Sequence, residues 1–218
     1  ESVLSMAVVR IAMGGFVMWQ ADIMGVRKIS GSVSDSFTLT YPFFGWIEAA
    51  PEWAEWLALA WFLSGLAFAT GTLFRLTAPL CTLMTIYQYL ISAELYLNHE
   101  YMEIIFLLLL ALGPSHHRLS IDQLIWRFGA TAPRYHLLAL KVQIEIILVY
   151  AGLVKINSDW LQLQPLSNWL LGHSDKIFIG ALFDNTLVVA AGAYGIVILH
   201  TLGAPLLFSR RLRKWVFL

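Results

Sequence analysis

The chain has 218 residues, of which 59% are hydrophobic and only 13% are charged, and its formal net charge at pH 7 is zero. A soluble domain carries about 25% charged residues, so this composition indicates a chain that is solvated by lipid. The neutral charge balance gives no support for a nucleic-acid partner. The single cysteine, Cys81, excludes an internal disulfide and a CxxC metal or redox motif.

The two ends of the sequence suggest a segment of a longer protein. The chain begins at Glu1 with no basic stretch before its first apolar run, a pattern that is not typical of a signal peptide. It stops at "RKWVFL", where another apolar run begins. We therefore expect one transmembrane domain, residues 1–218, cut from a longer chain.

Hydropathy predicts an all-α, polytopic membrane bundle with about six spans. A spanning helix needs about 20 mainly apolar residues. The expected spans are residues 3–24, 53–73, 76–95, 101–112, 135–154 and 186–208. Two connecting segments, "SIDQLIWRFG" and "PLSNWLLGH", predict short helices at the membrane surface, because each combines a helix-start signal with apolar and tryptophan side chains.

The basic residues of the loops predict the orientation, since cytoplasmic loops are enriched in Lys and Arg. One side of the predicted bundle holds Arg75, Arg118, Arg127, Arg134, Arg210, Arg211, Arg213 and Lys214, and the other holds Arg27, Lys28 and Lys176. The first side is expected to be cytoplasmic. The segment "YLNHEY" (96–101) and the end of the fifth span then share the outer face.

Several ionisable side chains fall inside the predicted spans, where a charge near the centre costs at least about 2.5–3.5 kcal/mol. We expect Arg10 to extend to the membrane surface or to pair with a carboxylate such as Glu145. We expect Lys141 to pair with Glu145 one turn later, and His200 to be a hydrogen-bonded core histidine. Other polar groups in the spans are Gln88, Glu94 and Glu103.

Two further patterns have structural interpretations. "HHR" (116–118) indicates a basic cytoplasmic turn rather than a metal site, because no cluster of other ligands accompanies it, and no metal site is expected. The tryptophans near span ends fit interfacial belts: Trp46, Trp53, Trp56, Trp160 and Trp169.

Lys155 ends the fifth apolar run in "YAGLVKINSDWL" (150–161) and allows two interpretations. A lysine at a span end usually extends to water as an anchor. In a dry cavity the ammonium form is disfavoured, and a lysine becomes a base. Gly152 lies one turn earlier on the same helical stripe and leaves space for a neighbouring helix or a ligand. His99 likewise allows a helix-capping or a functional role.

The chain resembles the vitamin K-dependent gamma-carboxylase family, whose membrane part is also called the HTTM domain. The resemblance rests on the ordered set "YPFFGWIEAAP", "LAFATGTLFRLTA", "YLNHEY", "SHHRLSIDQ", "APRYHLLALKVQIEIILVYAGLVKINSDWL", "PLSNWL" and "GAPLLFSRRLRKWVFL", which covers nearly the whole chain. One departure is Glu100, at a position where the family usually has a tyrosine. The family's large extramembrane domain does not follow in this sequence.

The resemblance implies an enzyme. Lys155 matches the family's catalytic base, which deprotonates reduced vitamin K or a related quinol, and His99 matches a second functional residue, acting at the carboxylation step. The implied co-substrates are O2 and CO2, and the quinol is converted to an epoxide while a glutamate is carboxylated. The implied partners are membrane lipid and a glutamate-containing protein or peptide.

Two non-enzymatic alternatives remain beside this reading. The chain could be a membrane module that binds a quinone or lipid or serves as a partner subunit, in which case Lys155 reaches water and no cavity forms. A transporter would favour paired broken helices and internal repeats, and neither is visible in the sequence. The enzyme reading predicts one dry pocket that joins His99 and Lys155.

Overall fold

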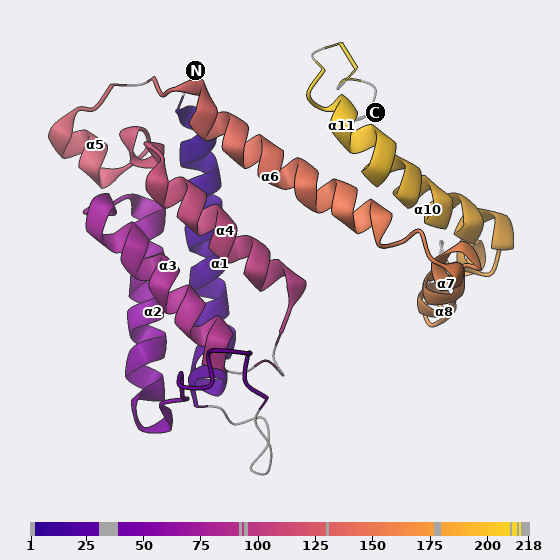
Figure 1. Ribbon diagram of the computed structural model, residues 1–218, viewed down its shortest axis with the longest axis horizontal. Helices are drawn as coiled ribbons and strands as arrows, with labels where there is room; N and C mark the ends of the chain where they lie inside the picture. Colours follow the sequence, from indigo (N-terminus) through magenta and orange to yellow (C-terminus); the bar gives the residue numbers. More distant parts are fainter. Residues whose placement is uncertain are drawn as a thin grey trace. The chain divides into compact units, whose positions relative to one another are not determined.

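The computed structural model describes residues 3–30, 39–91, 93, 96–129, 131–176, 180–209, 211–212 and 214. The chain divides into two compact units, Glu1–Leu140 and Lys141–Leu218, which are considered in turn. Both are built from helices (Figure 1). Glu94, Arg210, Arg213 and the end of the third predicted span at residue 95 lie outside the described residues.

The first unit is a helical bundle with a short surface helix. Its elements are α1 (Leu4–Ile29), the 3-10 turn η1 (Pro51–Trp53), α2 (Ala54–Thr70), α3 (Phe74–Ile91), α4 (Asn98–Leu112), the 3-10 turn η3 (Ser115–His117) and α5 (Ile121–Trp126). The helix α6 (Arg134–Leu153) begins in this unit. α1 packs along α2 and also contacts α3 and α4 (Figure 1).

Small residues set the close approach of α1 and α2. A methyl group added to Gly14 of α1 would lie 2.7 Å from the backbone nitrogen of Ala69 and from the carbonyl oxygen of Gly65. One added to Gly25 would lie 2.9 Å from the Cβ of Ala58. Helices in membranes associate through such contacts, because lipid offers no hydrophobic drive and tight packing must supply the attraction.

The turn between α2 and α3 is fixed by α5. Gly71 ends α2 in the left-handed region (φ 64°), which glycine adopts without steric cost. Asp122 of α5 accepts hydrogen bonds from the backbone nitrogens of Leu73 and Phe74, both at 2.8 Å, so it caps the start of α3. Ser120 caps α5 by accepting from the nitrogen of Gln123 at 2.9 Å, as its sequence predicts.

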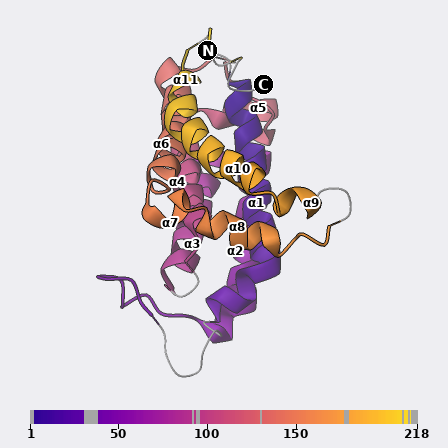
Figure 2. The same cartoon turned by 90° about the vertical axis from the view of Figure 1, so that its right-hand side faces the viewer.

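The second unit contains the rest of α6 and the helices that follow it. These are α7 (Ser158–Leu161), α8 (Gln164–Leu171), α9 (Gly180–Phe183), α10 (Thr186–Ile198), the π-helical turn η4 (Leu199–Gly203) and α11 (Ala204–Leu206). α7 and α8 pack against α10 (Figure 2). Tyr194 of α10 donates a hydrogen bond to the carbonyl of Leu161 at 2.9 Å, which ties α10 to α7.

Each of the six predicted spans contains a helix, but the count of about six membrane-crossing helices is not supported. Within the described residues, four helices are long and apolar enough to cross a membrane: Leu4–Ile29, Pro51–Thr70, Arg134–Leu153 and Thr186–Leu206. α3 carries Arg75, Gln88 and several threonines, which lower its hydropathy. α4 has 15 residues and is about 22 Å long, shorter than the roughly 30 Å hydrocarbon core.

Candidate functional site

Lys155 follows the end of α6 and lies in an apolar, aromatic setting. Its Nζ donates to the carbonyl oxygen of Ala151 at 2.9 Å and lies 5.3 Å from the centroid of the Trp160 ring. The side chain is half-buried. In the part of the chain that the structure describes, no carboxylate lies within ion-pair distance of this amine. The amine is therefore held by a carbonyl dipole and a ring face instead of an opposite charge.

Trp160 is a structural part of this site, and its assignment to an interfacial belt is wrong. Asn157 caps α7: its side-chain oxygen accepts a hydrogen bond from the backbone nitrogen of Trp160 at 2.9 Å. This bond fixes the backbone position from which the indole ring extends. The indole Nε1 donates to the carbonyl of Ala193 on α10 at 3.1 Å, and the side chain is only 7% exposed. The ring turns inward because its N–H finds this carbonyl, so it presents a fixed face to Lys155.

Gly152 accommodates a neighbouring helix, one of the two uses expected for it. A methyl group there would lie 2.6 Å from the Cγ2 of Thr201 and 2.9 Å from the Cβ of His200. Both belong to the π-helical turn η4, a geometry that often occurs at functional sites. Lys155 and His200 are close enough for their charges to interact.

We expected His200 to be a hydrogen-bonded core histidine. For one of its two ring nitrogens this expectation is wrong. Its Nδ1 is buried and has no hydrogen-bond partner. The structure brings His200 into the Lys155 site, a place that sequence reasoning missed. The signal in the sequence was Gly152, which lies on the same helical stripe as Lys155, because a glycine there leaves room for another helix to pass.

His99 lies in the first turn of α4, in the first unit. Its imidazole is exposed, and the ring of Phe16 on α1 meets it edge-on with centroids 6.0 Å apart. The N-cap of α4 is Leu97, and no side chain caps it, so the capping role for His99 is wrong. The imidazole therefore does not cap the helix and is exposed on the surface of the first unit.

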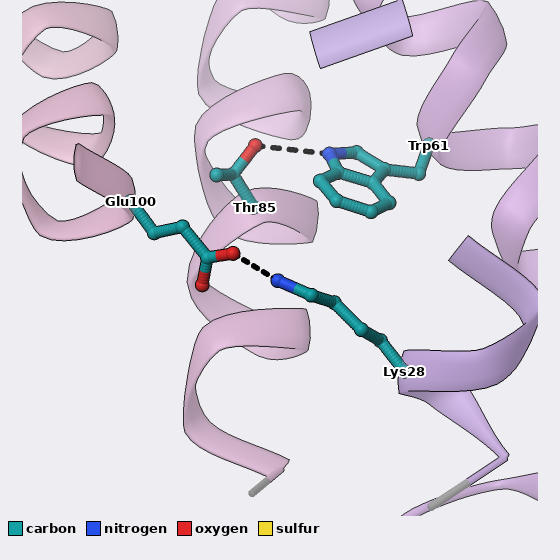
Figure 3. A network of polar contacts seen from close by, with 4 residues as sticks. All are labelled: Lys28, Trp61, Thr85 and Glu100. Carbon is teal, nitrogen blue, oxygen red and sulfur yellow. Dashed lines mark hydrogen bonds and ion pairs between the residues drawn. The ribbon is translucent and has the colours of Figure 1, made fainter. Parts of the chain in front are cut away.

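Glu100, the departure from the family pattern, has a structural partner. Its carboxylate forms a buried ion pair with the ammonium of Lys28 on α1 (Figure 3). Beside the pair, Trp61 of α2 donates through Nε1 to the hydroxyl of Thr85 on α3 at 3.0 Å (Figure 3). The first contact joins α1 to α4 at Glu100, the residue next to His99 in the sequence, and the second joins α2 to α3.

Arg10 is fully buried and pairs with backbone carbonyls, so neither expectation for it, extension to the surface or pairing with Glu145, is correct. Its five N–H groups donate to four carbonyl oxygens, those of Ala69, Ser115, Arg118 and Leu119. Ala69 lies near the C-terminal end of α2, where the helix dipole favours a cation. Arg10 thus fastens α1 to the end of α2 and to the loop after α4.

The predicted turn at His116 is present as η3, but His116 is buried in an aromatic cluster. Its ring stacks on Phe74 with centroids 4.8 Å apart and meets Phe128 edge-on at 5.1 Å. Burial and the neighbouring His117 lower the pKa of His116 to about 4, so the imidazole is neutral at physiological pH. His117 stacks on the other ring, that of Phe128, at 4.5 Å.

The expected pair between Lys141 and Glu145 does not form. Lys141 is exposed, while Glu145 is buried and its Oε2 has no partner. Among the described residues, the one ion pair within 4.0 Å joins Lys28 and Glu100. Lys141 and Glu145 lie one turn apart on α6, but one side chain is exposed and the other is buried. Helical spacing alone therefore does not bring them into contact.

The two site residues belong to different units, His99 to the first and Lys155 to the second. The pocket expected to join them stays a prediction. Within the first unit, the Lys28–Glu100 pair near His99 lies at the C-terminal end of α1. Arg118, whose carbonyl binds Arg10, lies toward the opposite end. His99 and the basic turn therefore occupy opposite ends of this bundle.

The model of a family described as the HTTM domain matches residues 2–218 and so spans both units. No solved structure matches the chain.

Proposed function

Because the chain belongs to the HTTM domain family, the membrane part of the gamma-carboxylase family, we propose that it is the membrane core of a quinol-dependent gamma-glutamyl carboxylase-like enzyme. The four apolar helices and the family membership make it an integral membrane protein. In this proposal Lys155 is the base that accepts a hydroxyl proton from a reduced vitamin K or related quinol.

The observation that carries the proposal is the setting of the Lys155 amine. A base must be able to lose its own proton, and an adjacent carboxylate would oppose that by stabilising the ammonium. Lys155 has a carbonyl and an indole face beside it and no carboxylate pair among the described residues. No carboxylate among the described residues therefore competes with a substrate hydroxyl for this amine.

The same surroundings fit a quinol. A flat, apolar ring is complementary to the exposed apolar side chains that flank Lys155 in the chain, Val154 and Ile156. A quinol bound there would supply oxygen-dependent chemistry that ends in the epoxide and generates the strong base needed at a glutamate γ carbon. The role of this chain is to bind the ring, take the hydroxyl proton at Lys155 Nζ and exclude water.

His99 is proposed to act at the carboxylation half of the reaction. Its exposed imidazole at the start of α4 is able to exchange a proton or orient a carboxylate. The edge contact with Phe16 limits the orientation of the ring. We place both His99 and Lys155 on the non-cytoplasmic side, and we propose α3 and α4 as the two remaining spans of a six-span bundle.

The experiment is oxygen-dependent epoxide formation from reduced vitamin K by the full-length protein in lipid. Lys155→Ala is expected to abolish the epoxide. Lys141→Ala is the matched control, because it removes an exposed lysine from α6, the helix that Lys155 follows. His99→Ala is expected to keep epoxide formation and to lose incorporation of labelled CO2 into a glutamate peptide. Epoxide formation at the wild-type rate in Lys155→Ala would reject the proposed base.

One observation favours the alternative of a non-enzymatic module. Lys155 Nζ binds the carbonyl of Ala151 near the end of α6, which is also how an anchoring lysine stabilises a helix C-terminus. In that case no epoxide forms in either protein, quinone or lipid binding is unchanged in Lys155→Ala, and only thermal stability falls.

A further inference from the structure

The interior of the first unit holds polar side chains that the proposed reaction does not use. Gln20 of α1, Gln88 of α3 and Glu103 of α4 are 2%, 3% and 0% exposed. They come from three different helices of the bundle, and Glu103 lies close enough to Glu100 and Lys28 for their charges to interact. Buried polar groups inside a membrane bundle are expensive, and they usually mark a functional site.

These side chains have unused hydrogen-bonding capacity. Both carboxyl oxygens of Glu103, both amide atoms of Gln88 and the Oε1 of Gln20 are buried without a hydrogen-bond partner. Gln20 faces the Glu103 carboxyl. Each buried, unsatisfied polar atom costs about 1–3 kcal/mol. Gln20 Oε1 gains a donor from Glu103 only if the carboxyl carries a proton, because a carboxylate has no hydrogen to donate.

The charges around Glu103 decide what is bound. The titratable groups that face it are Glu100 on its own helix, Lys28 of α1 and the thiol of Cys81 on α3. Lys28 is the one cation among these described neighbours, and it is already paired with Glu100. A second carboxylate here would be an uncompensated buried charge beside another carboxylate. A buried carboxyl in that position takes up a proton instead.

We propose that Glu103 is an internal proton-binding site of the α1–α4 bundle, with Gln20 as the amide that holds the protonated carboxyl. The carboxylate takes one proton from a hydronium ion: a carboxyl O–H bond forms, one O–H bond of the hydronium breaks, and a water molecule leaves. The hydroxyl of the acid then donates to Gln20 Oε1, and the Gln20 amide donates to the other carboxyl oxygen. This exchange satisfies both side chains and leaves the cluster electrically neutral.

The Glu103 site lies on the same helix as His99, the residue proposed to act at the carboxylation step. Glu103 lies one turn after His99 in α4. Glu100, which pairs with Lys28 of α1, falls between these two residues in the helix. The bundle thus stores a proton next to the exposed imidazole. This inference rests on the packing of the first unit alone, so it stands whether or not Lys155 acts on a quinol.

Infrared spectroscopy of the purified full-length protein tests the site, because a protonated carboxylic acid has a carbonyl stretch that a carboxylate lacks. The wild type at neutral pH is expected to show this band with the small shift in D2O that marks an exchangeable acid. The band should be lost in Glu103→Gln and kept in Glu55→Gln, which alters an exposed carboxylate on α2. Glu103→Gln should also melt within about 2 °C of the wild type, since one neutral group replaces another.

Three results would overturn the proposal. One is the absence of the band from the wild type at neutral pH, and another is its persistence in Glu103→Gln. The third is a melting temperature that rises with Na+ in the wild type but not in Glu103→Gln, which would indicate a cation bound to an ionised Glu103. If Glu103→Gln does not fold, Gln20→Leu serves instead: losing the amide partner should move the band to higher frequency, and an unmoved band rejects the pairing.

Discussion

Arg10 offers the sharpest test of how the first unit is held together. Arg10→Ala would leave the carbonyls of Ala69, Ser115, Arg118 and Leu119 without their donor. A loss of about 1 kcal/mol for each carbonyl lowers the free energy of unfolding by about 4 kcal/mol. Arg10→Lys keeps the charge but offers three donors in place of five, so we expect a loss of roughly 2 kcal/mol.

The assay is equilibrium unfolding of the full-length protein in detergent micelles, followed by the signal of its tryptophans. Arg27→Ala is the matched control, because Arg27 is an exposed arginine on the same helix, and its change should stay within about 0.5 kcal/mol. If Arg10→Ala is no less stable than Arg27→Ala, the carbonyl network does not fasten the bundle. Equal losses for Arg10→Lys and Arg10→Ala would mean that the fork geometry, and not the charge, is what counts.

Three further predictions concern packing and protonation. Gly14→Ala should destabilise the first unit by about 1–3 kcal/mol, because its methyl group would lie 2.7 Å from backbone atoms of α2. The methyl group added in Gly15→Ala would meet nothing within 4 Å, so this variant should be as stable as the wild type or more stable by up to about 1 kcal/mol. Equal effects of Gly14→Ala and Gly15→Ala on the melting temperature would disprove close packing at Gly14. Gly152→Ala should cost about 1–3 kcal/mol and separate α6 from η4, which loss of the contact with Thr201 in cross-linking would report. His116 has a pKa of about 4 in the folded state and about 6.5 when unfolded, so below about pH 6.5 the unfolded state binds the extra proton; stability should fall by up to about 1.4 kcal/mol per pH unit toward pH 4, and His116→Phe should remove this slope.

The helices themselves were predictable because their signals are local. Long apolar runs located α1, α2, α6 and α10, and the Ser120 cap and the Pro165 start located α5 and α8. Boundaries differed by a few residues, as at α1, which continues to Ile29 instead of ending near residue 24. The extra turn includes Lys28, which looked like a loop cation in the sequence and is instead buried against Glu100.

The candidate site was only partly predictable. The motifs around His99 and Lys155 singled out both residues, and no local signal indicated what would surround them. Trp160 turned inward because of a carbonyl 33 positions away, and His200 came beside Gly152 through the packing of η4. Neither contact has a spacing that a reader of the sequence could recognise.

The sequence alone determined that this chain is a helical membrane protein, which family it resembles and which two residues to examine. Those conclusions depend on hydropathy and short motifs, which are properties of neighbouring residues. The tertiary structure decided which polar groups are satisfied: Arg10 binds carbonyls from 59 to 109 positions away and Lys28 pairs with Glu100, while neither carboxyl oxygen of Glu103 has a hydrogen-bond partner among the described residues. In a low-dielectric interior, partners brought together from distant segments set the protonation state and the energetic cost of each buried polar group.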